Sequence, residues 1–199
     1  MANRAYLTRC DSDQIYPSFQ NPAFKPGEHT LLASAGCVPL LWWFLFAPED
    51  IALKQFTVRG QTFEEAAPVA PAEVALERFH ARLPLLEEWY AANGGLAHHH
   101  ELLASWISSH GGGCISIEWQ EIACLHAENV FRSAAEEALW FIADNDIGAK
   151  KPLTQLSTIF ETRRFLTRPE LDAENVEQED WWNFFRIMGE SHIAETPWG

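Results

Sequence analysis

The sequence has no apolar run long enough to cross a membrane. Its longest apolar stretch, residues 37–47, contains eleven residues and includes Pro39, whereas a membrane-spanning helix needs about twenty. No apolar stretch follows the basic residues at the N-terminus, so the sequence does not predict a secretory signal. We therefore expect a cytoplasmic protein with no membrane partner, in which residues 37–47 form a buried element.

Cysteine is scarce, and the motifs of several enzyme classes are missing. The four cysteines form no CxxC pair, which favours free, buried thiols over a disulfide framework. The chain contains no GxSxG and no HExxH motif. The glycines at 111–113 do not form a P-loop, because a predicted strand follows them and the Lys-Ser/Thr pair of that motif is missing. Three adjacent histidines at 98–100 point about 100° apart on a helix, so they cannot converge on one metal ion. We predict no metal site and no cofactor, and place these histidines in a polar first turn.

Basic residues are few. The chain has 14 Lys and Arg against 28 Asp and Glu, a formal net charge of −14. Half of that charge lies in residues 170–199, whereas residues 150–168 are net positive. Such a field repels nucleic acid and anionic membranes and attracts basic proteins or cations. An acidic surface also serves solubility alone, which is the alternative explanation.

Aromatic residues are abundant by contrast. Nine Trp and thirteen Phe occur among 199 residues, 47% of which are hydrophobic. This composition is typical of one globular domain, here spanning residues 1–199, with a well-packed core. Some of the aromatic side chains are also suited to a partner-binding surface.

The periodicity of apolar residues predicts a helix-rich α+β fold with a small antiparallel sheet. Alternation predicts strands at 3–9, 51–59 and 114–119, the last with one polar face. Helical spacing predicts helices at 37–47, with Ser34 as N-cap, and then at 72–92, 96–109, 127–144, 153–166 and 173–188. Pro84 is expected to kink or divide the second of these. Residues 64–71 are predicted to be a connector and 11–27 an irregular segment.

Cys114 is a candidate nucleophile. It follows the three glycines, and His110 and His126 lie nearby in the sequence. A catalytic cysteine needs a histidine within hydrogen-bond reach of its sulfur to stabilise the thiolate. The spacing does not establish such a contact, and a buried structural cysteine is the alternative.

The C-terminal segment combines acidic and aromatic residues. Six acids occur in eleven residues, and an aromatic cluster follows directly: Glu170, Asp172, Glu174, Glu177, Glu179 and Asp180, then Trp181, Trp182, Phe184 and Phe185. Charge would orient the encounter with a basic protein and aromatic anchors would prolong the contact. We therefore predict that Glu177, Asp180, Trp181 and Trp182 bind the partner. The alternative is a helix whose acids complement its macrodipole and whose aromatics pack inward.

The motif Met-Ala-Asn-Arg-Ala-Tyr-Leu at residues 1–7, with Val-Pro-Leu-Leu-Trp-Trp-Phe-Leu-Phe at 38–46, resembles a family of bacterial proteins of unknown function. Its members are about this length and begin with a similar Met-Ala-Asn-Arg-x-Tyr-Leu. The resemblance implies a bacterial cytoplasmic protein and brings no catalytic residues.

Three functional hypotheses follow. The leading one is a non-enzymatic acidic binding protein that occludes the surface of a basic partner, such as an immunity protein that neutralises a toxin. The second is a small enzyme with a Cys/His site near the three glycines. The third is a structural subunit whose aromatic residues form an obligate oligomer.

Overall fold

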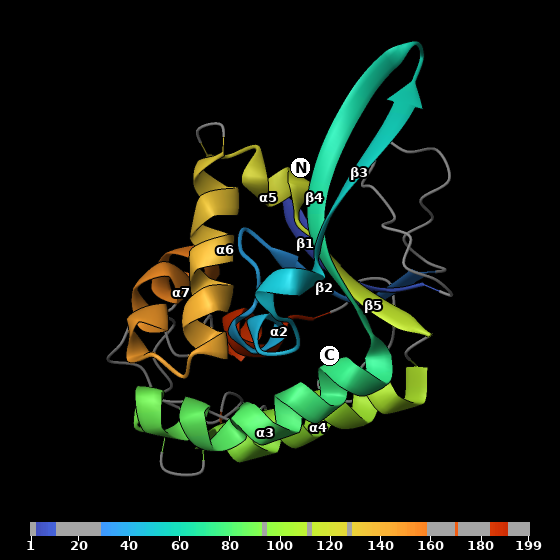
Figure 1. The fold of residues 1–199 in the computed structure, drawn as a ribbon. Coiled ribbons are helices and arrows are strands. Elements are labelled where there is room, and N and C mark those ends of the chain that lie inside the picture. Colours follow the sequence, from blue (N-terminus) through green and yellow to red (C-terminus); the bar gives the residue numbers. More distant parts are fainter. Residues whose placement is uncertain are drawn as a thin grey trace.

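A five-stranded antiparallel sheet organises the chain, with the strand order β2-β1-β5-β4-β3 (Figure 1). The computed structural model describes residues 3–10, 29–92, 95–110, 113–126, 129–158, 170 and 184–190. The strands are β1 (Arg4–Cys10), β2 (Thr30–Ala35), β3 (Ile51–Val58), β4 (Gln61–Pro71) and β5 (Cys114–Glu118). The predicted α+β single-domain class is confirmed, as are the strands near 3–9, 51–59 and 114–119.

The β3–β4 hairpin extends well beyond the rest of the sheet (Figure 1). The first eight residues of β4 pair with β3, and only the last three pair with β5. Arg59 and Gly60 form its two-residue turn with φ values of 50° and 80°, the left-handed conformation of a type I′ hairpin. The prediction of a connector at 64–71 is wrong, because cross-strand pairing outweighs the low strand propensity of Ala and Pro.

The apolar segment after β2 forms the centre of the core. Its helix, α2, covers only Leu40–Trp43, and every side chain from Leu40 to Phe46 is completely buried. The prediction of a helix at 37–47 capped by Ser34 is wrong: Ser34 belongs to β2 and pairs with Ala5, and Pro39 occupies the N-cap. Because this segment is buried on all sides, its residues show no amphipathic pattern, and the ends of its helix cannot be predicted from periodicity.

Two long helices, α3 (Ala72–Tyr90) and α4 (Gly95–His110), pack side by side below the sheet (Figure 1). The prediction of α4 is confirmed, whereas α3 continues through Pro84 instead of dividing there. The histidines at 98–100 do not form a polar turn, because His99 and His100 are buried. The His100 ring stacks on Phe79 with centroids 4.0 Å apart, since α4 turns this face toward α3.

The remaining helices cover the other side of the core segment (Figure 1). They are α5 (Gln120–Ala123), α6 (Val130–Ala143) and α7 (Lys150–Ser157), with short 3-10 turns at Pro48–Asp50 (η1) and Ile147–Ala149 (η2). The predicted helix at 153–166 begins earlier, and α7 ends at Thr158, whose φ is 52°. Residues 159–166 of that prediction lie outside the described residues.

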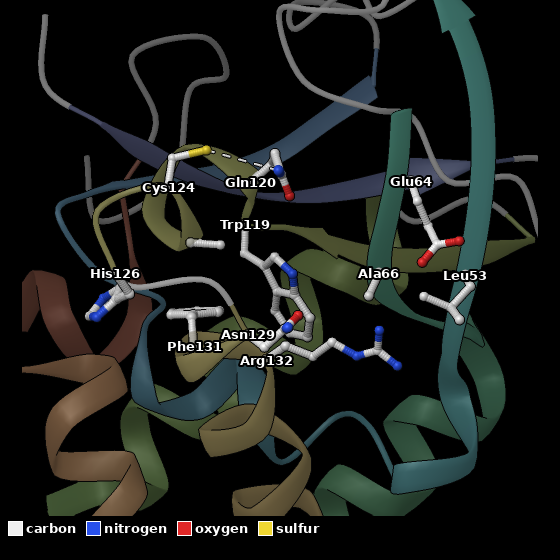
Figure 2. A pocket seen from close by; sticks show the side chains of 11 residues that line it. Leu53, Glu64, Ala66, Trp119, Gln120, Cys124, His126, Asn129, Phe131 and Arg132 are labelled. Carbon is white, nitrogen blue, oxygen red and sulfur yellow. Dashed lines mark hydrogen bonds between the residues drawn. The ribbon is translucent and has the colours of Figure 1, made fainter. Parts of the chain in front are cut away.

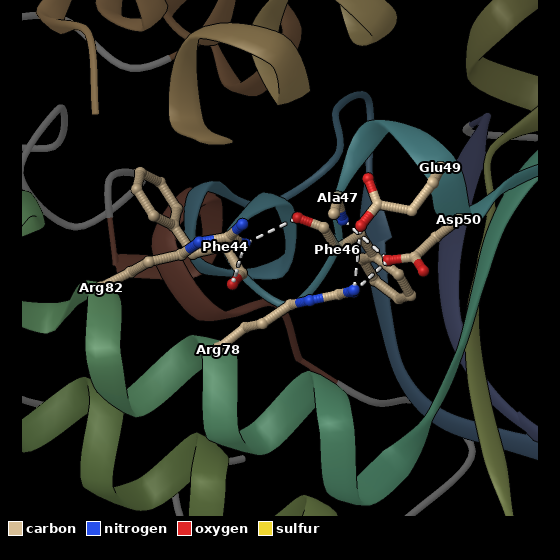
Figure 3. A network of polar contacts seen from close by, with 7 residues as sticks. All are labelled: Phe44, Phe46, Ala47, Glu49, Asp50, Arg78 and Arg82. Atoms are coloured by element: carbon tan, nitrogen blue, oxygen red, sulfur yellow. Dashed lines mark hydrogen bonds and ion pairs between the residues drawn. The ribbon is translucent and has the colours of Figure 1, made fainter. Parts of the chain in front are cut away.

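Two arginines of α3 hold the end of the core segment (Figure 3). One Arg82 nitrogen donates to the carbonyls of Phe44 and Phe46, at 2.9 and 2.7 Å. Arg78 forms ion pairs with Asp50 at 2.6 Å and Glu49 at 3.2 Å. Burial lowers the pKa of Arg82 to about 10, so it stays charged at neutral pH and caps carbonyls that no helix partner satisfies.

The C-terminal region returns to this core. Residues 184–188, the end of the helix predicted at 173–188, are helical, and Gly189 ends the helix with a φ of 78°. Residues 173–183 of that prediction lie outside the described residues. The indole of Trp42 donates to the Met188 carbonyl at 2.9 Å. Phe184 and Phe185 are buried, so these two aromatics pack inward, as in the alternative stated for the segment. Glu177, Asp180, Trp181 and Trp182 lie outside the described residues, so their role stays a prediction.

Candidate functional site

A half-open hollow of about 520 Å³ lies between the β3–β4 hairpin and the α5–α6 region (Figure 2). A second hollow of about 300 Å³ adjoins it, and both are lined by Leu53 and Arg132. We call the two together the hairpin groove. The charged and large apolar side chains that line it are Glu49, Leu53, Glu64, Trp119, Phe131, Arg132, Glu136 and Trp140.

One wall of the hairpin groove is a single face of the hairpin. Leu53 pairs with Ala66, and Glu64 pairs two residues further out with Gln55. Because alternate side chains of a strand point to the same face, Leu53, Ala66 and Glu64 all face α6 (Figure 2). Leu53 is 51% exposed, which leaves a large apolar side chain accessible on this wall.

The other wall is one face of α6 and the residue before it. Asn129, Arg132, Glu136 and Trp140 are spaced three, four and four residues apart, so they form a stripe along the helix. The Arg132 guanidinium donates to the Glu136 carboxylate at 2.8 Å. Trp140 is 61% exposed, which is unusual for tryptophan. Among the described lining residues, three carboxylates outnumber one guanidinium, so this part of the groove is net acidic.

The floor of the hairpin groove is aromatic and tightly held. Trp119 and Phe131 are each only 3% exposed, and their ring centroids lie 5.5 Å apart. Trp119 also stacks on Trp43 of α2 at 5.6 Å. The floor is therefore continuous with the core, which makes it a rigid platform between two exposed walls.

The polar side chains at the far end of the groove do not form a catalytic pair. Gln120 donates to the sulfur of the exposed Cys124 at 3.9 Å. His126 packs against Phe131, with ring centroids 5.4 Å apart, and its ring points away from the Cys124 sulfur (Figure 2). The expectation that the cysteines are buried holds for Cys37 and fails for Cys124, which is exposed, while Cys114 is only half-buried.

The structure separates Cys114 from His126, one of the two histidines predicted for its site. Cys114 starts β5, and His126 lies beyond the other end of that strand, which is about 14 Å long. The His110 ring stacks on Trp106 at 3.7 Å and contacts the Trp106 carbonyl through Nδ1 at 3.1 Å. The His110 ring is therefore held within its own helix, and His126 lies too far along the sheet to activate the sulfur.

The second face of the sheet holds two buried carboxyl groups. Glu118 and Glu65 are 2% and 5% exposed, and one oxygen of each has no hydrogen-bond partner among the described residues. Burial raises the pKa of Glu118 to about 8, with Glu65 and Glu121 adding repulsion, and burial raises the pKa of Glu65 to about 7. The predicted polar face of β5 is thus present but withdrawn from solvent, because Ser116 and Glu118 are both buried.

Sequence reasoning missed the hairpin groove because its walls come from segments that are distant in the chain. One signal was present: Trp140 falls outside the apolar face that the spacing of its helix predicts. Of that face, Ala134 and Phe141 are half-buried and the other members are buried: Phe131, Ala135, Ala138 and Ile142. Tryptophan is enriched in protein interfaces, so its position on the solvent side of an amphipathic helix is compatible with a contact surface.

In the described ranges, no group of three or more His, Cys, Asp or Glu side chains is arranged to hold a metal ion. None of the helices described there has the length and apolar character needed to cross a membrane. The chain matches no family model, no curated protein and no solved structure. The proposals below therefore rest on the geometry and charge of the described residues.

Proposed function

We propose that the protein is a non-enzymatic binding protein that occludes a surface of a basic partner protein, as an immunity protein does with its toxin. The observation that carries this proposal is the hairpin groove, whose described lining is net acidic and includes the exposed side chains of Leu53 and Trp140. Exposed aromatic and aliphatic anchors inside an acidic rim are the features that fast, oriented binding of a basic protein requires.

The charge distribution supports the same function. Both walls of the groove come from acidic stretches: residues 49–103 carry a net charge of −5 and residues 104–149 a net charge of −6. A partner of opposite sign is therefore attracted toward this side of the chain before any contact forms. The predicted C-terminal contacts, Glu177 and Asp180 with Trp181 and Trp182, belong to the same proposal as a second acidic-aromatic element.

Two variants test the proposal. Glu64→Lys with Glu136→Lys reverses charge in the groove, whereas Glu73→Lys with Glu137→Lys makes the same change at exposed positions that line neither hollow. Each full-length protein is tagged and incubated with a lysate of the organism that encodes it. We expect the unmodified chain and the control to capture the same basic protein, and the groove variant to lose it.

The captured protein is then assayed directly. It should inhibit growth when produced alone and be neutralised by co-production of the unmodified chain. Capture of no basic protein contradicts the proposed function. Recovery of an acidic or neutral partner, equally by all three proteins, contradicts it as well.

A further inference from the structure

We infer that the hairpin groove binds a short extended segment of a protein chain, in which an aliphatic side chain is flanked by Lys or Arg. This inference rests on the proposed function and specifies the partner chemistry of the same groove. It follows from three properties of the groove: its length, the order of its charged and apolar side chains, and the rigidity of its floor.

The stripe on the α6 wall sets the length. Asn129 and Trp140 are eleven residues apart, which corresponds to about 16 Å along a helix. An extended chain advances about 3.3 Å per residue, so about five residues span the groove. A segment of this size is shorter than a stable helix, which favours an extended occupant.

The carboxylates are distributed toward both ends of this length. Glu64 lines the larger hollow, whereas Glu49 and Glu136 line the smaller one. Among the described residues, Arg132 is bound to Glu136, and Glu49 is bound to Arg78, which also binds Asp50. With Glu64 included, four carboxylates stand against two guanidiniums, so the field stays acidic. A ligand segment with a basic residue toward each end therefore matches the field of the groove, while an acidic segment would be repelled.

Apolar side chains occupy the positions between these charges. Leu53 lines both hollows, and Trp119 and Phe131 form the floor beneath it. An aliphatic side chain of the ligand gains burial here at little entropic cost, because the floor is already ordered by the core. Trp140 lines the smaller hollow and is exposed, so its aromatic ring is available to a Lys or Arg of the ligand.

A phage-displayed library of random twelve-residue peptides, panned against the full chain, tests the inference. We expect enrichment of sequences that combine Lys or Arg with Leu, Ile or Val within about five residues. The best peptide is synthesised, and its affinity is measured by fluorescence anisotropy. We expect at least about tenfold weaker binding for Glu64→Lys with Glu136→Lys, and for Trp140→Ser.

The matched controls are Glu73→Lys with Glu137→Lys, and Ile147→Ser, which removes an apolar side chain that is 58% exposed and lies outside the groove. Both should retain the affinity of the unmodified chain, and thermal unfolding confirms that every variant is folded. Enrichment of acidic or purely polar sequences overturns the inference. So does a failure of any sequence to enrich, or equal loss of affinity in the control variants.

The outcome is separable from that of the proposed function. If the groove variants bind the peptide as tightly as the unmodified chain does, yet the basic partner is still captured from the lysate, the partner binds elsewhere on the chain. Only this inference then fails. If no basic partner is captured at all, the proposed function fails.

Discussion

Glu118 and Glu65 lie on a sheet face where the alternating pattern of β5 predicts contact with water. Both carboxyls are instead withdrawn from solvent, and each leaves one oxygen without a hydrogen-bond partner in the described part of the chain. A charged carboxylate is unfavourable in such a site, so the proton is retained to higher pH than usual. The Glu65 carboxylate also repels the Glu118 carboxylate when both are ionised, and this repulsion raises the pKa of Glu118 further.

The free energy of unfolding should therefore fall as pH rises from about 5 to about 9. The unfolded chain releases each proton near the ordinary pKa of 4.5, whereas the folded chain holds it to about 7 at Glu65 and about 8 at Glu118. Between these values the folded state binds more protons, so stability declines by up to about 1.4 kcal/mol per pH unit for each group. Urea unfolding across this pH range measures the slope.

Glu118→Gln should flatten this dependence, because the amide resembles the protonated carboxyl in shape and carries no charge to release. Glu73→Gln, at an exposed position of α3, is the control and should leave the slope as it is. A slope that persists unchanged in Glu118→Gln would show that another group governs the pH dependence.

Among the secondary-structure elements, the helical turn at 184–188 packs against the core, and its Phe184, Ile187 and Met188 are buried. Gly189 ends this turn. The next residue, Glu190, pairs with β2 by exchanging two backbone hydrogen bonds of 2.6 and 2.8 Å with Ala33. A Cβ on Gly189 would lie 2.7 Å from Cζ2 of the buried Trp42. Glycine is therefore required here both by conformation and by space.

Gly189→Ala should destabilise the protein more than Gly36→Ala does. Gly36 has nearly the same φ, 79° against 78°, but a Cβ there meets no atom within 4 Å. The left-handed conformation alone costs about 1–2 kcal/mol, and overpacking against Trp42 adds about 1–3 kcal/mol more at Gly189. Urea unfolding of both variants measures the difference, and equal losses would show that the Trp42 contact relaxes without cost.

For the whole molecule, the uneven distribution of charge is the property most relevant to a partner. Residues 150–168 are basic, while the stretches on either side of them are acidic. The basic stretch begins with α7, whereas the walls of the hairpin groove belong to acidic stretches. A basic partner is therefore drawn to particular regions of the chain instead of being attracted uniformly.

Association with the partner captured in the lysate experiment should slow as ionic strength rises, because salt screens the attraction between separated charges. Glu177→Lys with Asp180→Lys should slow association further at low salt, whereas Trp181→Ala with Trp182→Ala should mainly speed dissociation. Surface plasmon resonance separates the two rates. Glu73→Lys with Glu137→Lys is the control, and equal slowing by that control would assign the effect to net charge alone.

Local pattern was a good guide where an element has one buried and one exposed face. The spacing of Leu96, Leu103 and Ile107 predicts α4, and all three side chains are buried. It was a poor guide for elements with uniform surroundings: β4 contains two prolines and three alanines, and its strand is imposed by pairing with β3 and β5. Pattern-based prediction fails there because the stabilising hydrogen bonds join residues that are distant in sequence or belong to another strand.

The candidate site illustrates the same limit. The acidity of residues 49–103 and 104–149 is plain in the chain, and Trp140 stands out on the polar side of α6. That these features face one another follows only from the position of the hairpin, which brings Leu53 and Glu64 opposite Arg132 (Figure 2). Leu53 also lines the smaller hollow together with Glu136. In contrast to the exposed Trp140, the C-terminal Phe184 and Phe185 pack into the core, and the sequence left both positions open for them.

Composition and periodicity were sufficient to establish an acidic, aromatic-rich α+β chain, because burial of one face leaves a regular trace in the order of residues. They were also sufficient to separate its basic stretch from its acidic ones. The hairpin groove, the buried carboxyls and the central position of residues 40–46 depend on contacts between segments far apart in the chain. Such contacts are set by packing and strand pairing, which leave no periodic trace in the residues that make them.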